Sequence, residues 1–177
     1  LHPGEHDAFF LPMRADTSAT LFEHCARGLD QCISLTGAHE LPLIGTGDWN
    51  DGMNRVGEGG KGESVWLGWF LLKTLGDFAA VAKTEGDAKH AQAWAKHADA
   101  LKRALESTAW DGEWYRRGSF DDGTPLGSRS SQECKIDSIA QSWSVLSGEG
   151  DQARSTTAME QATKLLVDDK LKIVKLF

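Results

Sequence analysis

The chain has 177 residues, 40% of them hydrophobic, and a formal net charge of -7 at neutral pH. A chain of this length and composition can bury a core and is usually a single domain. The acidic balance repels phosphate backbones and no basic cluster offsets it, so we expect no nucleic-acid partner.

Helical periodicity dominates the first half of the chain. The polar residues 1–7 do not begin with Met and have no signal-peptide pattern, so we expect this start to be internal to a longer protein. The first predicted helix covers residues 17–34, with Asp16 or Thr17 as N-cap. Its predicted buried stripe consists of Leu21, Cys25, Leu29 and Cys32.

Two longer helices are predicted next. Residues 64–83 carry a broad apolar face, and residues 87–105 are rich in alanine. The apolar run 65–82 is interrupted by Lys73 and Asp77, which indicates a buried helix more than a membrane span. The residues expected to face inward in the two helices are Val65, Trp69, Leu72, Leu75, Ala79, Trp94, Leu101 and Leu105.

The remaining elements are short. Residues 135–146 and 150–167 supply two more predicted helices, and turn signals flank a segment over 114–120 that can be extended. No set of strands could make a large sheet. We therefore predict an all-α fold, with helices joined by long glycine-rich loops and room for one short β-hairpin.

The cysteines and histidines predict neither disulfide nor metal. Cys25 and Cys32 would lie about 10 Å apart along a helix, which is too far for a disulfide. Cys134 is distant and no C-x-x-C occurs, so a reducing compartment is favoured and the helical pair is interpreted as small core residues. His90 and His97 share a helical face without a third ligand nearby.

The segment 45–54, G-T-G-D-W-N-D-G-M-N, holds the densest chemistry of the chain. The indole of Trp49 can stack on a pyranose ring, and Asn50 and Asn54 can hydrogen-bond its hydroxyls. A carboxylate held against the indole has its proton affinity raised by desolvation, and a protonated aspartate there can donate to a glycosidic oxygen.

Other interpretations of this region compete with a sugar site. From residue types alone, Asx-turns by Asp48 and Asp51 in a surface loop are about equally supported. An EF-hand is disfavoured because Gly59 stands where the bidentate glutamate is needed. A P-loop is disfavoured because Gly62 replaces the Ser or Thr that would hold magnesium.

The segment 47–54, followed by G-E-S-V-W at residues 62–66, resembles the catalytic signature of glycoside hydrolase family 94, the inverting β-glucoside phosphorylases. A second segment, A-Q-S-W-S-V-L-S-G at residues 140–148, resembles another pattern of that family. Further similarity is to the C-terminal phosphorylase-like region of the cyclic β-1,2-glucan synthases. It lies at residues 4–8, 41–45, 114–117 and 120–128.

The resemblance implies a partial (α/α)6 barrel. Such a barrel needs about twelve helices and this chain supplies five or six, so residues 1–177 would be part of one glycoside phosphorylase catalytic domain. Two parts of the family pattern are not found: the upstream Arg and Asp that hold the nonreducing sugar, and the downstream histidine segment that helps bind phosphate. The fragment alone is therefore expected to be inactive.

The resemblance also assigns roles. It implies inverting phosphorolysis of a β-linked glucan, with inorganic phosphate as co-substrate, no cofactor, and release of glucose 1-phosphate. The general acid maps onto Asp51, and Trp49 maps onto a residue lining the sugar site. Asp48 is expected to brace the loop, although an acid at that position stays open. The expected substrate-binding residues are Trp49, Asp48, Asn50, Asn54 and Gln141.

Two of these residues have purely structural interpretations that are about equally supported. Gln141 could reach a sugar hydroxyl from its helix or could simply pack. Glu63 could contact sugar or could be a first-turn charge that favours the helix dipole.

Two other functions remain open, a noncatalytic glucan-binding module and an inverting hydrolase on the same barrel. Phosphate dependence separates all three. The resembled synthases suggest a cytoplasmic domain of a bacterial inner-membrane protein. Half a barrel would leave Val65, Trp69 and Leu72 uncovered, so we expect binding to the missing segments of the same domain or a homo-oligomer.

Overall fold

The computed structural model describes residues 11–49 and 51–177. Over these residues the chain forms five α-helices, two short helical turns and five strands of two residues each. The helices are α1 (Leu21–Ser34), α2 (Val65–Thr84), α3 (Ala88–Ala104), α4 (Ser138–Leu146) and α5 (Gln152–Leu166). The turns are the 3-10 helix η1 (Asp51–Met53) and the π-helix η2 (Leu105–Ala109).

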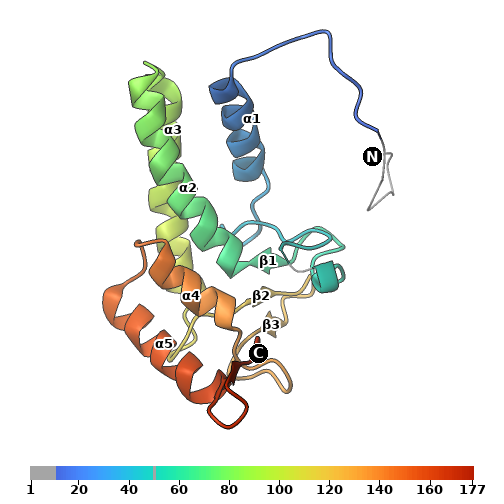
Figure 1. The fold of residues 1–177 in the computed structure, drawn as a ribbon, viewed down its shortest axis with the longest axis vertical. Coiled ribbons are helices and arrows are strands. Elements are labelled where there is room, and N and C mark those ends of the chain that lie inside the picture. The colour runs from blue at the N-terminus through green and yellow to red at the C-terminus, as the bar shows by residue number, and fades with distance from the viewer. Residues whose placement is uncertain (1–10, 50) are drawn as a thin grey trace.

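The strands make two small antiparallel sheets. β1 (Glu63–Ser64), β2 (Gly118–Ser119) and β3 (Pro125–Leu126) form one sheet in that order, while β4 (Val167–Asp168) pairs with β5 (Ile173–Val174). In Figure 1, α2 and α3 run side by side, and the three-stranded sheet lies at the end where α2 begins. The predicted mainly helical fold is confirmed; β2 lies in the segment 114–120 that was expected to be extended, while β3 and the β4–β5 pair lie outside it.

Helix α2 is the central element. The side chain of its N-cap Ser64 accepts a hydrogen bond from the Leu67 N–H, and the helix packs against α3, α4 and η2. Within the described residues it is also the one helix long and apolar enough to cross a membrane, but half of its apolar window is buried in the fold. This is the pattern of a core helix. All the residues predicted to face inward are buried: Val65, Trp69, Leu72, Leu75, Ala79, Trp94, Leu101 and Leu105.

Helix α1 differs from its prediction. It begins at Leu21, because Thr20 and Glu23 form a capping box in which each side chain accepts from the other residue's backbone N–H. The predicted caps, Asp16 and Thr17, therefore lie before the helix. The predicted stripe is right only at Leu29: the buried residues of α1 are Ala26 and Leu29, while Leu21 is 80% exposed.

The cysteines of α1 are not core residues. Cys32 is exposed and Cys25 is half-buried, because the face that α1 buries is formed by Ala26 and Leu29. Both are free in this structure, as is Cys134.

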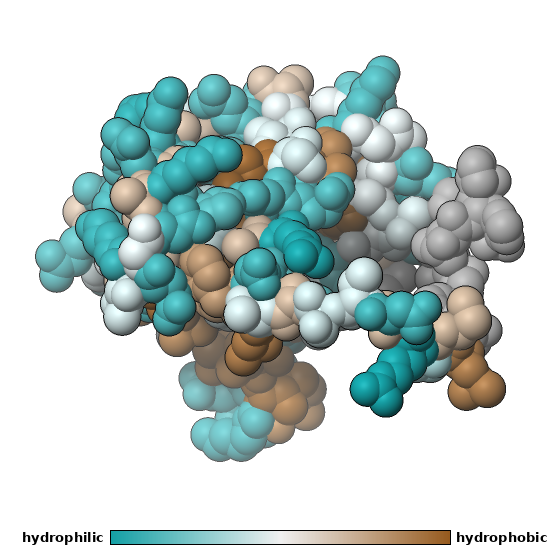
Figure 2. Space-filling model, turned by 90° about the horizontal axis from the view of Figure 1, so that it is seen from above, coloured by the Kyte–Doolittle hydropathy of each residue, from teal (hydrophilic) through white to brown (hydrophobic). Residues whose placement is uncertain are grey.

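The expectation that Val65, Trp69 and Leu72 would lie uncovered is wrong. Elements of the same chain cover them, and the rings of Trp69 and Tyr115 form a T-shaped pair at a centroid distance of 5.1 Å. Apolar side chains do reach the surface elsewhere, and Figure 2 shows hydrophobic residues among hydrophilic ones on one face. Those on the helices include Phe70, Val81, Val145, Leu146 and Leu165.

Candidate functional site

The candidate site is built on the glycine-flanked loop of residues 45–54. The chain that leads into this loop is hydrogen-bonded to the three-stranded sheet. The Ser64 N–H donates to the Pro42 carbonyl and the Ile44 N–H to the Gly62 carbonyl, each at 2.9 Å, so the chain runs antiparallel to β1. Gly45 and Gly47 then take φ of 58° and 138°, a region that favours glycine. These two residues turn the chain so that Asp48 points into the protein.

The side chain of Asp48 is fully buried and braces the loop. Its Oδ2 accepts from the Ser64 hydroxyl at 2.9 Å, from the Trp66 indole N–H at 2.7 Å and from Arg117 at 2.6 Å. Its Oδ1 accepts from the same Arg117 nitrogen at 2.8 Å. Because donors face both oxygens, the group is held as an acceptor. It is placed neither to give a proton nor to touch a sugar, which corrects its expected substrate contact.

Arg117 is the centre of this buried cluster. Its guanidinium is fully buried, donates to the Ser64 hydroxyl at 3.1 Å, and places Nε 3.3 Å from Oδ2 of Asp137 without hydrogen-bond geometry. Asp137 is the N-cap of α4 and accepts from the Ile139 N–H at 2.8 Å. Burial raises the pKa of Asp137 and nearby Asp48 acts in the same direction, against the opposing effects of the Ile139 N–H and Arg117.

Trp49 follows this anchor directly and is 50% exposed. Asn54 is exposed as well, in the turn that follows η1. Asn50 and the side chain of Asp51 lie outside the described residues, and only the backbone of Asp51 is placed, at the start of η1. The loop is thus anchored at Asp48, and its next residue presents an indole at the surface.

Gln141 does not lie at the surface. Its side chain is fully buried, and its amide oxygen accepts from the Tyr115 N–H at 2.9 Å. Its amide nitrogen donates to the carbonyls of Tyr115 at 2.7 Å and of Asp137 at 2.9 Å. An amide that completes three backbone hydrogen bonds in the core is not available to a sugar, so the packing alternative replaces the expected substrate contact.

Glu63 also takes a role that its sequence position did not predict. It lies in β1, before the N-cap of α2, and is 2% exposed, so it is not a first-turn helix charge. Its carboxylate accepts from the backbone N–H of His39 at 2.9 Å and contacts the His39 ring at 2.5 Å. The pair fastens the loop before residue 41 to the sheet.

The glycine-rich turn at residues 57–62 is closed by a carboxylate of the protein itself. Asp121 accepts from the N–H groups of Gly59 and Lys61 at 2.7 Å and of Gly62 at 2.9 Å. These backbone bonds, led by the one from Lys61, lower the pKa of Asp121. The donors that would cradle a phosphate in a P-loop are therefore occupied.

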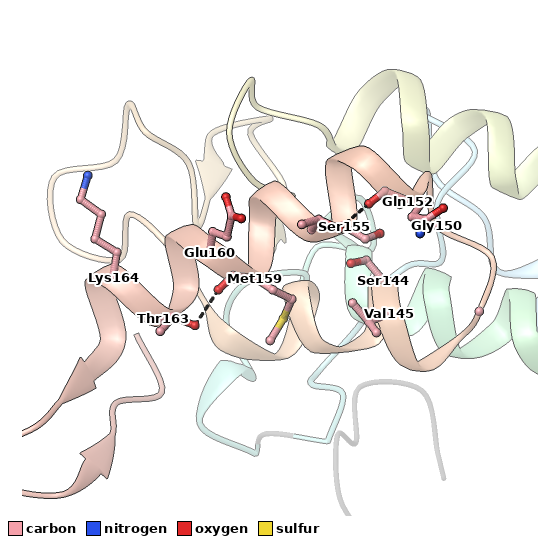
Figure 3. A pocket seen from close by; sticks show the side chains of 11 residues that line it. Ser144, Val145, Gly150, Gln152, Ser155, Met159, Glu160, Thr163 and Lys164 are labelled. Atoms are coloured by element: carbon pink, nitrogen blue, oxygen red, sulfur yellow. Dashed lines mark hydrogen bonds between the residues drawn. The ribbon is translucent and has the colours of Figure 1, made fainter.

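Two cavities differ in their relation to the loop. A cavity of 890 Å³ lies between α4 and α5 (Figure 3), and its lining, which includes Ser144, Ser155 and Met159, contains no residue of the loop. A second cavity, of 540 Å³, is lined by Gly52 and Met53 together with Phe120, Leu126 and Cys134. We place the candidate site at the second, because it adjoins the acidic loop.

The residues that hold the loop were missed by sequence reasoning. Ser64, Trp66 and Arg117 belong to segments that carry the family resemblance, but no local pattern assigns them a role. Asp137 precedes the helix that carries the A-Q-S-W segment, where its only sequence signal is that of an N-cap. The contact between Arg117 and Asp48 joins positions 69 residues apart.

The helical scaffold anchors a glycine-flanked acidic loop and exposes an indole beside it, which suits stacking on a sugar ring. The family model described as "Glycosyl hydrolase 94 superfamily, catalytic domain" matches residues 2–175. The chain therefore belongs to this family of carbohydrate-active enzymes.

Individual relatives agree with this family. The chain is 56% identical over 177 residues to the cyclic beta-(1,2)-glucan synthase NdvB of Rhizobium meliloti (strain 1021), covering 100% of this chain and 6% of that protein. It is 37% identical over 131 residues to the 3-O-beta-D-glucopyranosyl-beta-D-glucuronide phosphorylase of Paenibacillus borealis, covering 74% and 17%. It is 33% identical over 162 residues to the solabiose phosphorylase of the same organism, covering 91% and 20%. The chain thus spans a fifth or less of each relative.

A solved structure supports the fold alone. The GH78 family rhamnosidase of Bacillus sp. GL1 superposes with a TM-score of 0.64 at 19% sequence identity, covering 82% of this chain and 15% of the rhamnosidase. The helical arrangement is consistent with a mostly α fragment of an α/α barrel.

Proposed function

We propose that this chain takes part in the inverting phosphorolysis of a β-linked glucoside, with β-1,2-glucan as substrate. The observation that carries the proposal is the half-exposed indole of Trp49, which emerges directly from the buried anchor at Asp48. A flat indole beside an acidic loop suits stacking on a pyranose ring. The synthase and phosphorylase names of the relatives support the substrate class and the reaction.

Asp51 is the proposed general acid. Asp48 has donors on both of its oxygens, which leaves Asp51 as the other carboxylate of the loop. In the proposed reaction Asp51 gives its proton to the glycosidic oxygen as the bond to the anomeric carbon breaks. A phosphate oxygen forms the new bond from the opposite face, which yields glucose 1-phosphate with inversion.

Phosphate explains why one carboxylate suffices. An inverting hydrolase needs a second carboxylate to deprotonate water, whereas phosphate is already an anionic nucleophile. We therefore assign phosphate as co-substrate and no cofactor. Trp49, with Asn50 and Asn54, is the proposed contact to the sugar.

The activity belongs to a larger unit in this proposal. Residues 1–177 form part of one glycoside phosphorylase catalytic domain, an incomplete barrel that does not turn over alone. We further propose that this domain lies on the cytoplasmic side of a bacterial inner-membrane protein. Fractionation of cells that carry the natural protein, with protease protection of this domain, tests that placement.

The reaction is tested by phosphate dependence. The natural protein that carries this sequence is incubated with β-1,2-linked gluco-oligosaccharides, with and without inorganic phosphate, in parallel with the chain alone. Glucose 1-phosphate that forms only with phosphate supports the proposal. Free glucose without phosphate would identify a hydrolase instead, and binding without turnover would identify a glucan-binding module.

A further inference from the structure

A buried arginine links the base of the candidate catalytic loop to two distant elements. Arg117 directly precedes β2, Asp48 lies in the loop, and Asp137 caps α4. The side chains of Arg117 and Asp48 are 0% exposed and that of Asp137 is 1% exposed. The buried ion pair between Arg117 and Asp48 is held firmly in place, because breaking it would leave an unpaired charge in the core.

We infer that Arg117 is a positioning residue, which sets the place of Trp49 and Asp51 by fixing Asp48. This inference rests on the proposed function for its kinetic consequence. Trp49 is covalently next to Asp48, and Asp51 is three residues further along the chain, so a shift of the Asp48 backbone displaces the start of the segment to which both belong. In a catalytic site, a misplacement of about 1 Å can lower the rate by about a hundredfold.

The contacts require an arginine rather than only a positive charge. One terminal nitrogen of Arg117 reaches both oxygens of Asp48, at 2.8 and 2.6 Å, while the other reaches the Ser64 hydroxyl at 3.1 Å. Its Nε lies beside Asp137. A lysine keeps the charge but is a point donor that cannot serve three directions in one plane.

The neighbouring arginine provides a matched control. Arg116 also forms an ion pair, with Asp111 at 3.2 Å, but its side chain is 36% exposed and contacts neither the loop nor β1 through that pair. Arg116→Lys therefore changes the same residue type at the next position without touching the anchor.

The kinetic experiment compares Arg117→Lys, Asp48→Asn, the double variant and Arg116→Lys in the natural protein. We expect the first two each to lower kcat for phosphorolysis by about 10- to 100-fold with a smaller change in KM, and Arg116→Lys to leave both unchanged. Because Arg117 acts through Asp48, the double variant should lose little more than either single variant. Losses that multiply in the double variant, or unchanged kcat in folded Arg117→Lys, would overturn the inference.

A second readout uses the chain alone and needs no turnover. The contribution of Trp49 to acrylamide quenching is obtained as the difference between each form and its Trp49→Phe counterpart, at a temperature where circular dichroism shows both folded. We expect Arg117→Lys and Asp48→Asn to increase the quenching of Trp49, and Arg116→Lys not to. Unchanged quenching in both anchor variants contradicts the inference. If quenching rises but the natural protein releases no glucose 1-phosphate, the positioning role stands and the proposed function fails.

Discussion

At the scale of single residues, Asp51 carries the most specific chemical assignment. Asp51→Asn keeps the shape of the side chain and removes the transferable proton, so phosphorolysis in the natural protein should fall by about 10²–10⁴-fold while sugar binding persists. Release of glucose 1-phosphate and calorimetric titration with a β-1,2-linked oligosaccharide measure the two effects.

Asp122→Asn is the matched control for Asp51→Asn, because Asp122 lies in an exposed turn where it accepts from the Thr124 N–H. It should leave the rate unchanged. Near-normal rates for Asp51→Asn on an unactivated glucan would remove Asp51 from its role. The same assay on Asp48→Asn measures how much rate is lost when only the buried anchor of the loop is disturbed.

Trp49 and Trp94 offer a contrast between a surface indole and a core indole. Trp49 is 50% exposed, so Trp49→Ala should weaken saccharide binding with little loss of folding stability. Trp94 is 0% exposed and donates to Asp30 at 2.9 Å, so Trp94→Ala should cost about 3–5 kcal/mol of unfolding free energy. Urea denaturation and titration with oligosaccharide check both. A large stability loss for Trp49→Ala with unchanged sugar affinity would make Trp49 a packing residue.

At the scale of elements, α1 is attached to α3 through a titrating contact. His90 contacts Asp87 at 2.5 Å and Asp30 of α1 at 3.2 Å, and Trp94 of α3 binds the same Asp30. The hydrogen bond to Asp87, with a smaller contribution from Asp30, raises the pKa of His90 above its ordinary value of 6.5. The bonds from His90 lower the pKa of Asp87 below 3.8.

These two directions define a pH window for the contacts of His90, of which the one with Asp30 holds α1 and the one with Asp87 lies at the start of α3. The raised pKa of His90 contributes stability that is fully present below pH 6.5 and is lost as the pH rises through the folded-state value. The lowered pKa of Asp87 contributes stability that is present above pH 3.8 and is lost as the pH falls through its folded-state value. The protection factors of amides in α1, which are exchange rates corrected for the base-catalysed intrinsic rate, should therefore be highest at low pH and should fall as the pH rises through the folded-state pKa of His90. His90→Asn should flatten the alkaline side, and a profile unchanged by this variant would show that His90 does not hold α1.

All five helices could be predicted within a few residues, but the start of α1, predicted at residue 17 and found at Leu21, was placed too early. The side chains of Ser64, Asp87, Asp137 and Asp151 cap α2 to α5, and a cap followed by apolar periodicity is a signal within one short segment. In α1 several polar residues compete for the cap. The reciprocal bonds of Thr20 and Glu23 decide between them.

The misplaced site residues share a nonlocal cause. Glu63 pairs with Ser119 in the sheet, and Gln141 holds the backbone of Tyr115, so in both cases a partner distant in sequence decides the burial. The loop with Trp49 could be recognised in the sequence as a candidate site because its residues are contiguous. Its anchor was not, because Asp48, Arg117 and Asp137 meet only after the sheet and α4 have assembled.

At the scale of the whole molecule, the apolar side chains left at the surface predict association. Phe70 is 43% exposed, Val145 51% and Leu146 64%, and they come from α2 and α4, which pack against each other. Exposed apolar patches above about a few hundred Å² are rare on soluble monomers and usually mark a contact surface. If the chain is part of a larger barrel, further helices of that domain would cover this surface.

The isolated chain should therefore be folded, self-associate with rising concentration and bind a hydrophobic dye. Sedimentation velocity over a concentration series and dye fluorescence measure these properties. The double substitution Val145→Ser, Leu146→Gln should lower both self-association and dye fluorescence. The melting temperature should change little, because these side chains are already exposed to solvent. Leu72→Ala, at a position 3% exposed, should instead destabilise the fold by about 2–5 kcal/mol without removing the patch. A compact monomer that binds no dye at any concentration would mean that these helices need no further partner, and the incomplete-barrel proposal would then be wrong.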